Sequence, residues 1–242
     1  MSRKPDKKAS AVRRARAAAL REQAQRSERR RRRLIALAVS VVVLAVIAGI
    51  TIALLRTSDE PTTSRTPAQE GIPTTPVKTA SGRTTEPPWD PPSDPSARVE
   101  AAGLPMLGEE GNVEHIHAHL DVLVNGKPVS VSADIGVDEQ AQQISPLHTH
   151  ETNGVIHIES PVKAGFSLGQ FMTEWNVALT KDSIGGLKTA DGNEFRAYVN
   201  GKEYPGNPAA IEFRQHDQIA LVYGPKDQKV EVPSSYDWPE GE

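Results

Sequence analysis

The sequence predicts an α+β domain, with a small, mostly antiparallel sheet of hairpins and one packed helix, behind a membrane anchor and a linker. Three observations support this prediction. One run of the chain is apolar and uncharged, Asn-Gly pairs separate runs of alternating apolar residues, and a single segment changes to a helical period. The predicted order is a basic tail over 1–33, a transmembrane helix over 34–55, a disordered linker over 56–105, a domain over 106–224 and an acidic tail over 225–242.

The run from Leu34 to Leu55 is long enough to cross a bilayer, for which about 20 apolar residues suffice. A secretory signal peptide is the alternative, but its apolar part is shorter and ends at a small-residue cleavage site, which this run lacks. Residues 1–33 hold fourteen basic and three acidic residues, which predicts a cytoplasmic N-terminus. We therefore expect a single-pass protein of the cell membrane that contacts the lipid bilayer through residues 34–55, with its C-terminal domain outside.

The charge of the remaining chain favours cations as partners. The basic tail carries +11 and the whole chain −3, so the rest carries −14. Such an acidic domain is a poor partner for nucleic acid. Cysteine is absent, so a metal site in this chain has no thiolate ligand. With only three methionines, the chain also lacks the soft sulfur ligands that a Cu(I) carrier prefers.

Residues 56–105 are rich in Pro, Thr, Ser and Asp and poor in apolar residues. This composition is typical of a disordered, partly extended linker. Trp89 stands in its most proline-rich part. We expect this lone aromatic side chain to be solvated, with docking on the domain as the alternative.

The first hairpin is predicted at Asn125-Gly126, because both residues tolerate a positive φ. A two-residue loop there pairs Val122 with Val129 and gives the hairpin one apolar face. Side chains alternate between the faces of a strand, so the odd-numbered residues share the opposite face. Those residues are His115, His117, His119 and Asp121.

A second hairpin is predicted at Asn153-Gly154. A two-residue loop there pairs His150 with His157 and His148 with Glu159. Directly opposed side chains have Cβ atoms about 4.5–5.5 Å apart, a separation at which two imidazoles can share one metal ion. Whether the two hairpins lie side by side is not given by the sequence.

These registers predict a metal site built from histidines. The candidate ligands are His115, His117, His119, His148, His150 and His157. The candidate carboxylate ligands, or acceptors behind the imidazoles, are Asp121, Glu151 and Glu159. A set of three or four histidines without sulfur suits a divalent transition metal, and zinc or copper is preferred outside the membrane. The alternatives are a solvated face without a special role and a face that responds to pH.

The segment Phe166 to Trp175 has apolar residues at helical spacing, with Ser167 as a plausible N-cap. Strands are expected again over 194–199, 202–204 and 218–223. The string "RAYVNGKEYPGNPAAIEFRQHDQIALVYG" resembles the closing strands of the ubiquitin-like β-grasp. That resemblance covers Val155 to Tyr223 and implies fold alone.

The motifs "EHIHAHLDVLVNGK" and "SPLHTHETNGVIHIESP" resemble those of bacterial, often membrane-anchored, histidine-rich proteins, a group without an assigned function. The resemblance covers Glu114 to Trp175 and implies that this stretch is one domain.

The function expected from these observations is metal binding or sequestration at the cell surface. One alternative is a metal-dependent enzyme, hydrolytic or redox, because three histidines with an open position form a catalytic zinc arrangement. The other is a metal-free module that binds a protein or a glycan. Known nucleophile, phosphate-loop, dinucleotide and zinc-protease motifs are absent, so the sequence identifies no catalytic residue. His216, in a polar turn, is expected to be structural or solvated.

Overall fold

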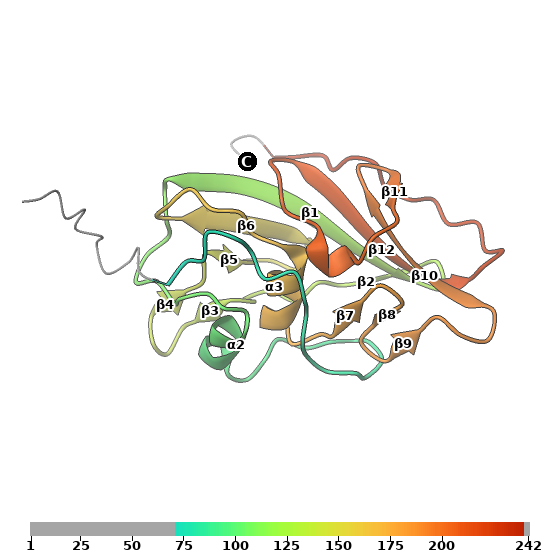
Figure 1. Ribbon diagram of the computed structural model, residues 1–242, viewed down its shortest axis with the longest axis horizontal. Coiled ribbons are helices and arrows are strands. Elements are labelled where there is room, and N and C mark those ends of the chain that lie inside the picture. Colours follow the sequence, from blue (N-terminus) through green and yellow to red (C-terminus); the bar gives the residue numbers. More distant parts are fainter. Residues whose placement is uncertain (1–70, 240–242) are drawn as a thin grey trace, which may run out of the picture. The chain divides into compact units, whose positions relative to one another are not determined.

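A seven-stranded sheet organises residues 71–239, the residues that the computed structural model describes (Figure 1). Its strands, in order across the sheet, are β11 (Lys202–Tyr204), β10 (Asn193–Val199), β12 (Asp217–Pro225), β1 (Glu114–Val124), β6 (Val155–Ser160) and β5 (Leu147–His148), and β2 (Lys127–Val129) also pairs with β1. The central strands β1 and β12 are parallel, whereas the other neighbours are antiparallel. The described unit is thus α+β and dominated by its sheet, as expected.

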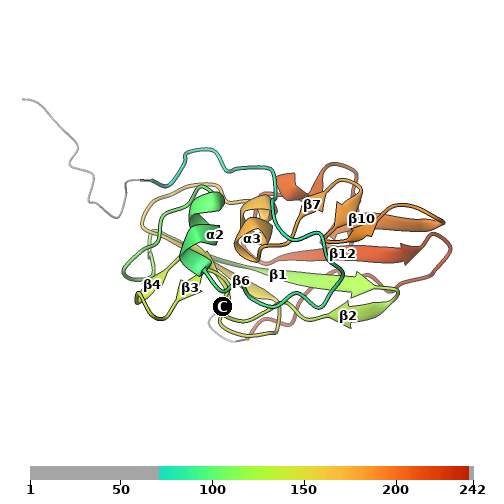
Figure 2. The ribbon, with the colours of Figure 1, turned by 90° about the horizontal axis from the view of Figure 1, so that it is seen from below.

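The remaining elements lie on one side of this sheet (Figures 1 and 2). They are the helices α2 (Pro95–Ala101) and α3 (Leu168–Glu174), the 3-10 turn η2 (Pro208–Ala210), a two-stranded sheet of β3 (Val137–Asp138) and β4 (Gln143–Ile144), and a three-stranded sheet of β7 (Leu179–Thr180), β8 (Ser183–Ile184) and β9 (Leu187–Lys188). The hydrophobic core joins the apolar face of the large sheet to α3.

Helix α3 confirms the helical segment expected from the sequence. Ser167 and Gln170 form a capping box at its start, each side chain bonding the backbone N–H of the other. The side chains at helical spacing are fully buried, and they are Leu168, Phe171, Met172 and Trp175. The helix therefore packs in the core, and the histidines lie on the opposite face of the sheet.

The first predicted hairpin is confirmed. Asn125 and Gly126 have φ values of 51° and 73°, as a two-residue turn of type I′ requires, and Val122 pairs with Val129. Asn200 and Gly201 form a second turn of this kind between β10 and β11. At both turns, the tolerance of Asn-Gly for positive φ is sufficient to form the hairpin.

The predicted register of the second hairpin is wrong by two residues. His148, and not His150, pairs with His157, and only Gly154 of the Asn-Gly pair has a positive φ. The reason is contact with β1. The Gly154 carbonyl accepts a hydrogen bond from the Leu120 N–H at 2.9 Å, and a Cβ on Gly154 would stand 2.5 Å from the Leu120 carbonyl oxygen. An offset of two residues keeps every side chain on its predicted face.

The prediction of a disordered linker is wrong for its described part, residues 71–105. Trp89 is 2% exposed, packs edge-on against Trp175 and donates from its indole N–H to the Thr85 carbonyl. Helix α2 buries Val99 completely. Composition indicated disorder because prolines and polar residues dominate the segment, but a few buried apolar side chains fix it to the core. The domain therefore begins before the predicted boundary at 106.

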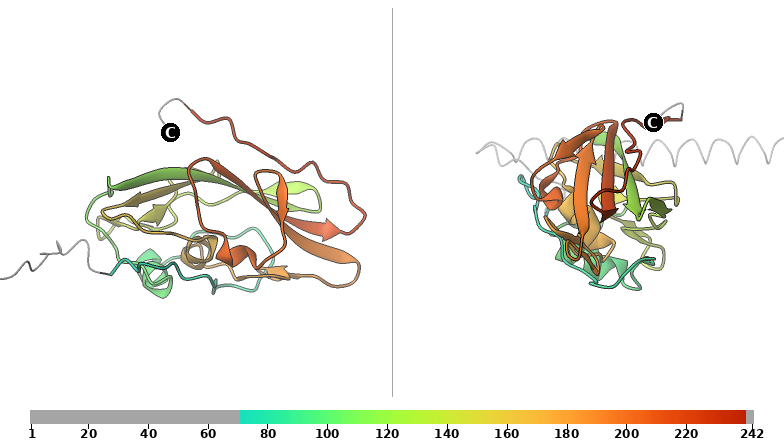
Figure 3. Two further views of the ribbon diagram at one scale, coloured as in Figure 1. Left: turned by 45° about the horizontal axis from the view of Figure 1, so that its top comes forward. Right: turned by 90° about the vertical axis from the view of Figure 1, so that its right-hand side faces the viewer.

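The predicted acidic tail also packs on the domain. After β12 the chain returns across the sheet on the side opposite α3 (Figure 3). There the ring of Tyr236 stacks on His119 at a centroid distance of 3.9 Å. The basic tail and the transmembrane helix predicted over 1–33 and 34–55 lie outside the described residues. Among residues 71–239, no helix has the length and apolar character that crossing a membrane requires.

Candidate metal centre

Three neighbouring strands place three histidines in one row on the face opposite the core. His117 of β1 is opposite His157 of β6, and His157 is opposite His148 of β5. The alternation along β1 turns Ala118 and Leu120 into the core and the histidines away from it. The two predicted histidine hairpins therefore lie side by side, which the sequence had left open.

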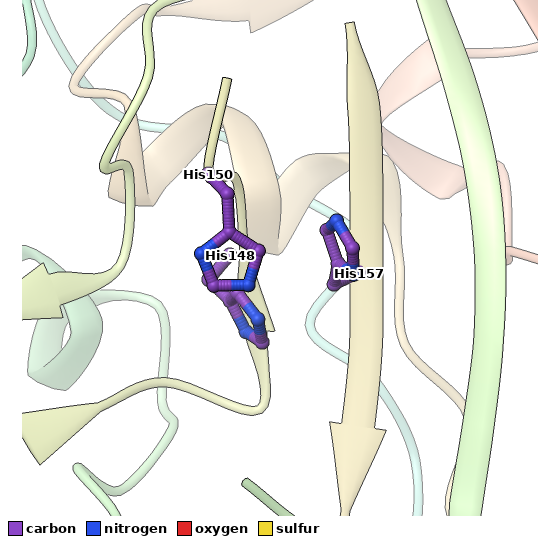
Figure 4. A group of neighbouring side chains, drawn as sticks. All are labelled: His148, His150 and His157. Atoms are coloured by element: carbon purple, nitrogen blue, oxygen red, sulfur yellow. The ribbon is translucent and has the colours of Figure 1, made fainter. Parts of the chain in front are cut away.

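The first histidine group consists of His148, His150 and His157 (Figure 4). One ring nitrogen of each residue lies within 4.8 Å of one from each of the others. The centroid of the His150 ring lies 4.7 Å from that of His148 and 4.7 Å from that of His157. These residues can hold a metal ion, because a small movement of the rings brings three imidazole nitrogens onto one centre.

His148 is the most firmly held member of this group. Its Nδ1 lies 3.0 Å from the Ser145 carbonyl oxygen, which can only accept, so Nδ1 carries the proton. The other nitrogen, Nε2, is buried without a hydrogen-bond partner and therefore keeps its lone pair. Burial, followed by the neighbouring His157, lowers the pKa of His148 to about 3. At neutral pH this ring is uncharged and oriented, as a metal ligand must be.

Glu110 joins this group, although no sequence pattern indicated it. It lies in the loop before β1, and its Oε1 is 3.6 Å from His150 Nε2 and 4.0 Å from His148 Nε2. Glu110, His148 and Glu159 also form a set whose ligand atoms lie within 4.8 Å of one another. No spacing rule connects a loop carboxylate to strands far along the chain.

The second histidine group consists of His115, His117 and Glu159, again with ligand atoms within 4.8 Å of one another. Glu159 is 5% exposed, and its Oε1 lies 3.5 Å from His115 Nε2 and 3.4 Å from His157 Nδ1. Burial raises the pKa of this carboxyl, but its contact with His157 and the nearby rings outweighs that effect and lowers the pKa. Glu159 is thus a buried carboxylate enclosed by imidazoles.

His119 and Asp121 are not brought into either group. Both ring nitrogens of His119 face oxygen atoms, with Nδ1 3.0 Å from Gln218 Oε1 and Nε2 2.8 Å from the Asn153 carbonyl. Gln218 in turn donates to Asp121 at 2.9 Å. These residues tie β1, β12 and the loop before β6 together, so their role in the structure is to hold the strands.

Glu151 also lies outside both groups. Its carboxylate accepts a hydrogen bond from the Asn153 side chain at 3.1 Å, and the residue is exposed. Of the three carboxylates predicted from the sequence, only Glu159 lies among the ligand atoms.

The C-terminal segment covers part of the histidine face. Trp238 stacks on His216 at a centroid distance of 4.7 Å, and its ring lies 6.5 Å from that of His117. Tyr236 packs against Trp238 at 4.9 Å. The aromatic pair was readable in the sequence, but nothing in the spacing indicated where it would dock.

Ser145 connects His148 to a buried acid on the core side of the sheet. Its carbonyl accepts from His148, and its hydroxyl donates to Glu174 Oε1 at 2.8 Å. Glu174 is completely buried in α3, and burial raises its pKa well above the ordinary 4.5 despite the hydrogen bond from Ser145. We therefore expect Glu174 to hold a proton in the folded state at a pH where the unfolded chain has released it.

This difference makes a prediction about stability. Above pH 4.5 the unfolded chain loses the Glu174 proton first, so the folded state loses up to about 1.4 kcal/mol of stability per pH unit. Substitution E174Q removes this dependence, and its stability relative to the parent should rise with pH above 4.5 and stay level below it. Urea unfolding across pH measures the difference, and E151Q at an exposed site is the control. A free energy of unfolding that changes with pH in parallel for E174Q and the parent would contradict a raised pKa of Glu174.

Comparison of the chain with protein-family models, with curated proteins and with solved structures finds no match.

Proposed function

We propose that this chain binds a divalent transition metal through His148, His150 and His157, on a domain that the predicted span over 34–55 anchors outside the cell membrane. The observation that carries the proposal is His148, whose Nε2 is buried without a hydrogen-bond partner and whose ring lies in a group of three imidazoles. A buried polar atom without a partner costs about 1–3 kcal/mol, and a bound metal ion removes that cost.

The donor set supports zinc or oxidised copper. The group offers nitrogen from three imidazoles and oxygen from Glu110, without sulfur. Zn²⁺ takes four such ligands in a tetrahedron, and Cu²⁺ accepts nitrogen and oxygen in a flatter arrangement. The negative charge of the chain outside the basic tail favours cations at this surface. Metal binding or sequestration at the cell surface is the function that these features support best.

The experiment is a Zn²⁺ titration of the full-length chain in detergent micelles after removal of metal by a chelator. We expect at least one equivalent to bind and the melting temperature to rise. H157N should weaken binding by at least about 10–100-fold, because it removes a direct ligand. H216N is the matched control, since His216 lies outside both groups, and it should bind as the parent does. A parent chain that binds neither Zn²⁺ nor Cu²⁺ would refute the proposal and favour a metal-free interaction module.

A metal-dependent enzyme, hydrolytic or redox, is the second candidate. The side chains of His150 and Glu110 are 45% and 51% exposed, so one side of the first group is open to solvent. An open position beside three histidines is what catalytic zinc requires. Binding of azide to the Co²⁺-substituted chain would favour this candidate over a closed metal store.

We also infer that the sheet core is a β-grasp. The order β6-β1-β12-β10-β11 supports this assignment, with β1 and β12 parallel and with α3 between the pair β1–β6 and the pair β10–β11 in sequence. The fold carries no information on activity, which depends on the histidine face.

A further inference from the structure

The second histidine group directly adjoins the first. Pairing of β1 with β6 sets His117 opposite His157 and His115 opposite Glu159. The rings of His117 and His157 are 4.7 Å apart between centroids. The two sets of candidate ligands therefore form one continuous surface across β1, β6 and the end of β5.

One oxygen atom lies close to histidines of both groups. Oε1 of Glu159 lies 3.5 Å from Nε2 of His115, in the second group, and 3.4 Å from Nδ1 of His157, in the first. Both separations exceed the usual hydrogen-bond range of about 2.7–3.2 Å. They match the edge of a tetrahedron around a metal ion with bonds of about 2.0 Å, an edge of about 3.3 Å.

A positive charge beside Glu159 would stabilise its buried carboxylate. A buried carboxylate is costly unless it is paired, hydrogen-bonded or bound to a metal. Within residues 71–239, the side chains at ion-pair distance from Glu159 are the imidazoles of His115 and His157, and neither Lys nor Arg is among them. A cation placed beside Glu159 supplies the missing charge.

We propose that His115, His117 and Glu159 bind a second metal ion, and that the Glu159 carboxylate bridges it to the ion held by His148, His150 and His157. This inference rests on the proposed function, because it adds a neighbour to the first site. Paired metal ions in proteins are typically about 3.5–4 Å apart, a spacing that one bridging oxygen can span. The ligand is a divalent transition metal in both positions.

Stoichiometry tests the second ion separately from the first. The metal-free full-length chain in detergent is titrated with Zn²⁺, and bound zinc is counted by elemental analysis. The parent and the H216N control should bind two equivalents, and H115N one. His115 suits this test because its side chain is 54% exposed, so its loss should leave folding intact, which circular dichroism checks.

The outcomes separate the two proposals. One equivalent in both the parent and H115N would overturn the second site and leave the first standing. Two equivalents in both would place the second ion elsewhere and also overturn it. No bound zinc in the parent would refute the proposed function itself.

The bridge has its own test in E159Q, which keeps the shape of the side chain and removes its charge. A bridging carboxylate serves both ions, so E159Q should weaken both binding steps. Loss of only the weaker step would overturn the bridge. Cu²⁺ gives a second measurement, because two bridged ions couple magnetically. The parent loaded with two equivalents should show a coupled electron paramagnetic resonance spectrum, and H115N an uncoupled one. An uncoupled spectrum in the parent would contradict the inference.

Discussion

Substitution of His148 by asparagine is expected to weaken Zn²⁺ binding by about 100-fold or more, whereas H150N should weaken it by about 10-fold. The reason is the difference in preorganisation. His148 is fully buried and its ring is oriented by the Ser145 carbonyl. His150 is 45% exposed in its side chain, so it must lose about 0.5–1.5 kcal/mol of conformational freedom before it can bind.

Isothermal titration calorimetry of both variants with Zn²⁺ in detergent micelles measures this difference in affinity, with H216N as the control. H148Q is a second variant at the buried position, because glutamine fills more of the imidazole volume than asparagine does. Circular dichroism confirms that each variant is folded. Equal losses for positions 148 and 150 would contradict the preorganisation argument, and unchanged affinity at both would remove the first group as a metal site.

The second large effect is expected in stability. W89A should lower the free energy of unfolding by about 3–5 kcal/mol, the usual cost of removing a buried tryptophan. Trp89 is 2% exposed and its carbonyl accepts a hydrogen bond from the Trp175 indole at 3.0 Å. The cavity left by W89A would open between the segment 71–105 and α3.

Two variants make this prediction precise. W89F retains most of the buried area and loses the bond from the indole N–H to Thr85, so its cost should be about 1 kcal/mol. W238A removes a partly exposed tryptophan that stacks on His216, and its cost should stay below about 1.5 kcal/mol. Urea unfolding measures the free energy of unfolding of W89A, W89F and W238A. A loss below 1 kcal/mol for W89A would mean that the segment around Trp89 does not unfold together with the core.

Much of the fold could be predicted from the sequence because its signals are local. The capping box at Ser167 and the turn at Asn125-Gly126 depend on residues within four positions of each other. Alternation along β1 was enough to assign the histidines to the face away from the core. The candidate ligands therefore followed from the period of a strand.

The rest depended on contacts between distant parts of the chain. At Asn153-Gly154 the local preference for a two-residue turn is overridden by contacts with β1. The Asn153 carbonyl bonds the His119 ring, and the Gly154 carbonyl accepts from the Leu120 N–H. The position of Glu110 in a loop was likewise set by tertiary packing. The register of this hairpin differs from the predicted one by two residues. Two residues along a strand return a side chain to the same face, so the histidines lie on the predicted face although their pairing differs from the predicted one.

If the chain is anchored through residues 34–55, as proposed, the packing of residues 71–105 would limit how far the histidine face could lie from the membrane. With the predicted span ending at 55, the connection to the described domain is about fifteen residues, 56–70, instead of the fifty of the predicted linker. A fully extended chain covers at most about 3.5 Å per residue, so the tether reaches about 50 Å instead of about 175 Å. A domain on such a tether would stay within that distance of the lipid surface. There it would meet metal ions that leave or enter the cell at that membrane before they mix with the surroundings.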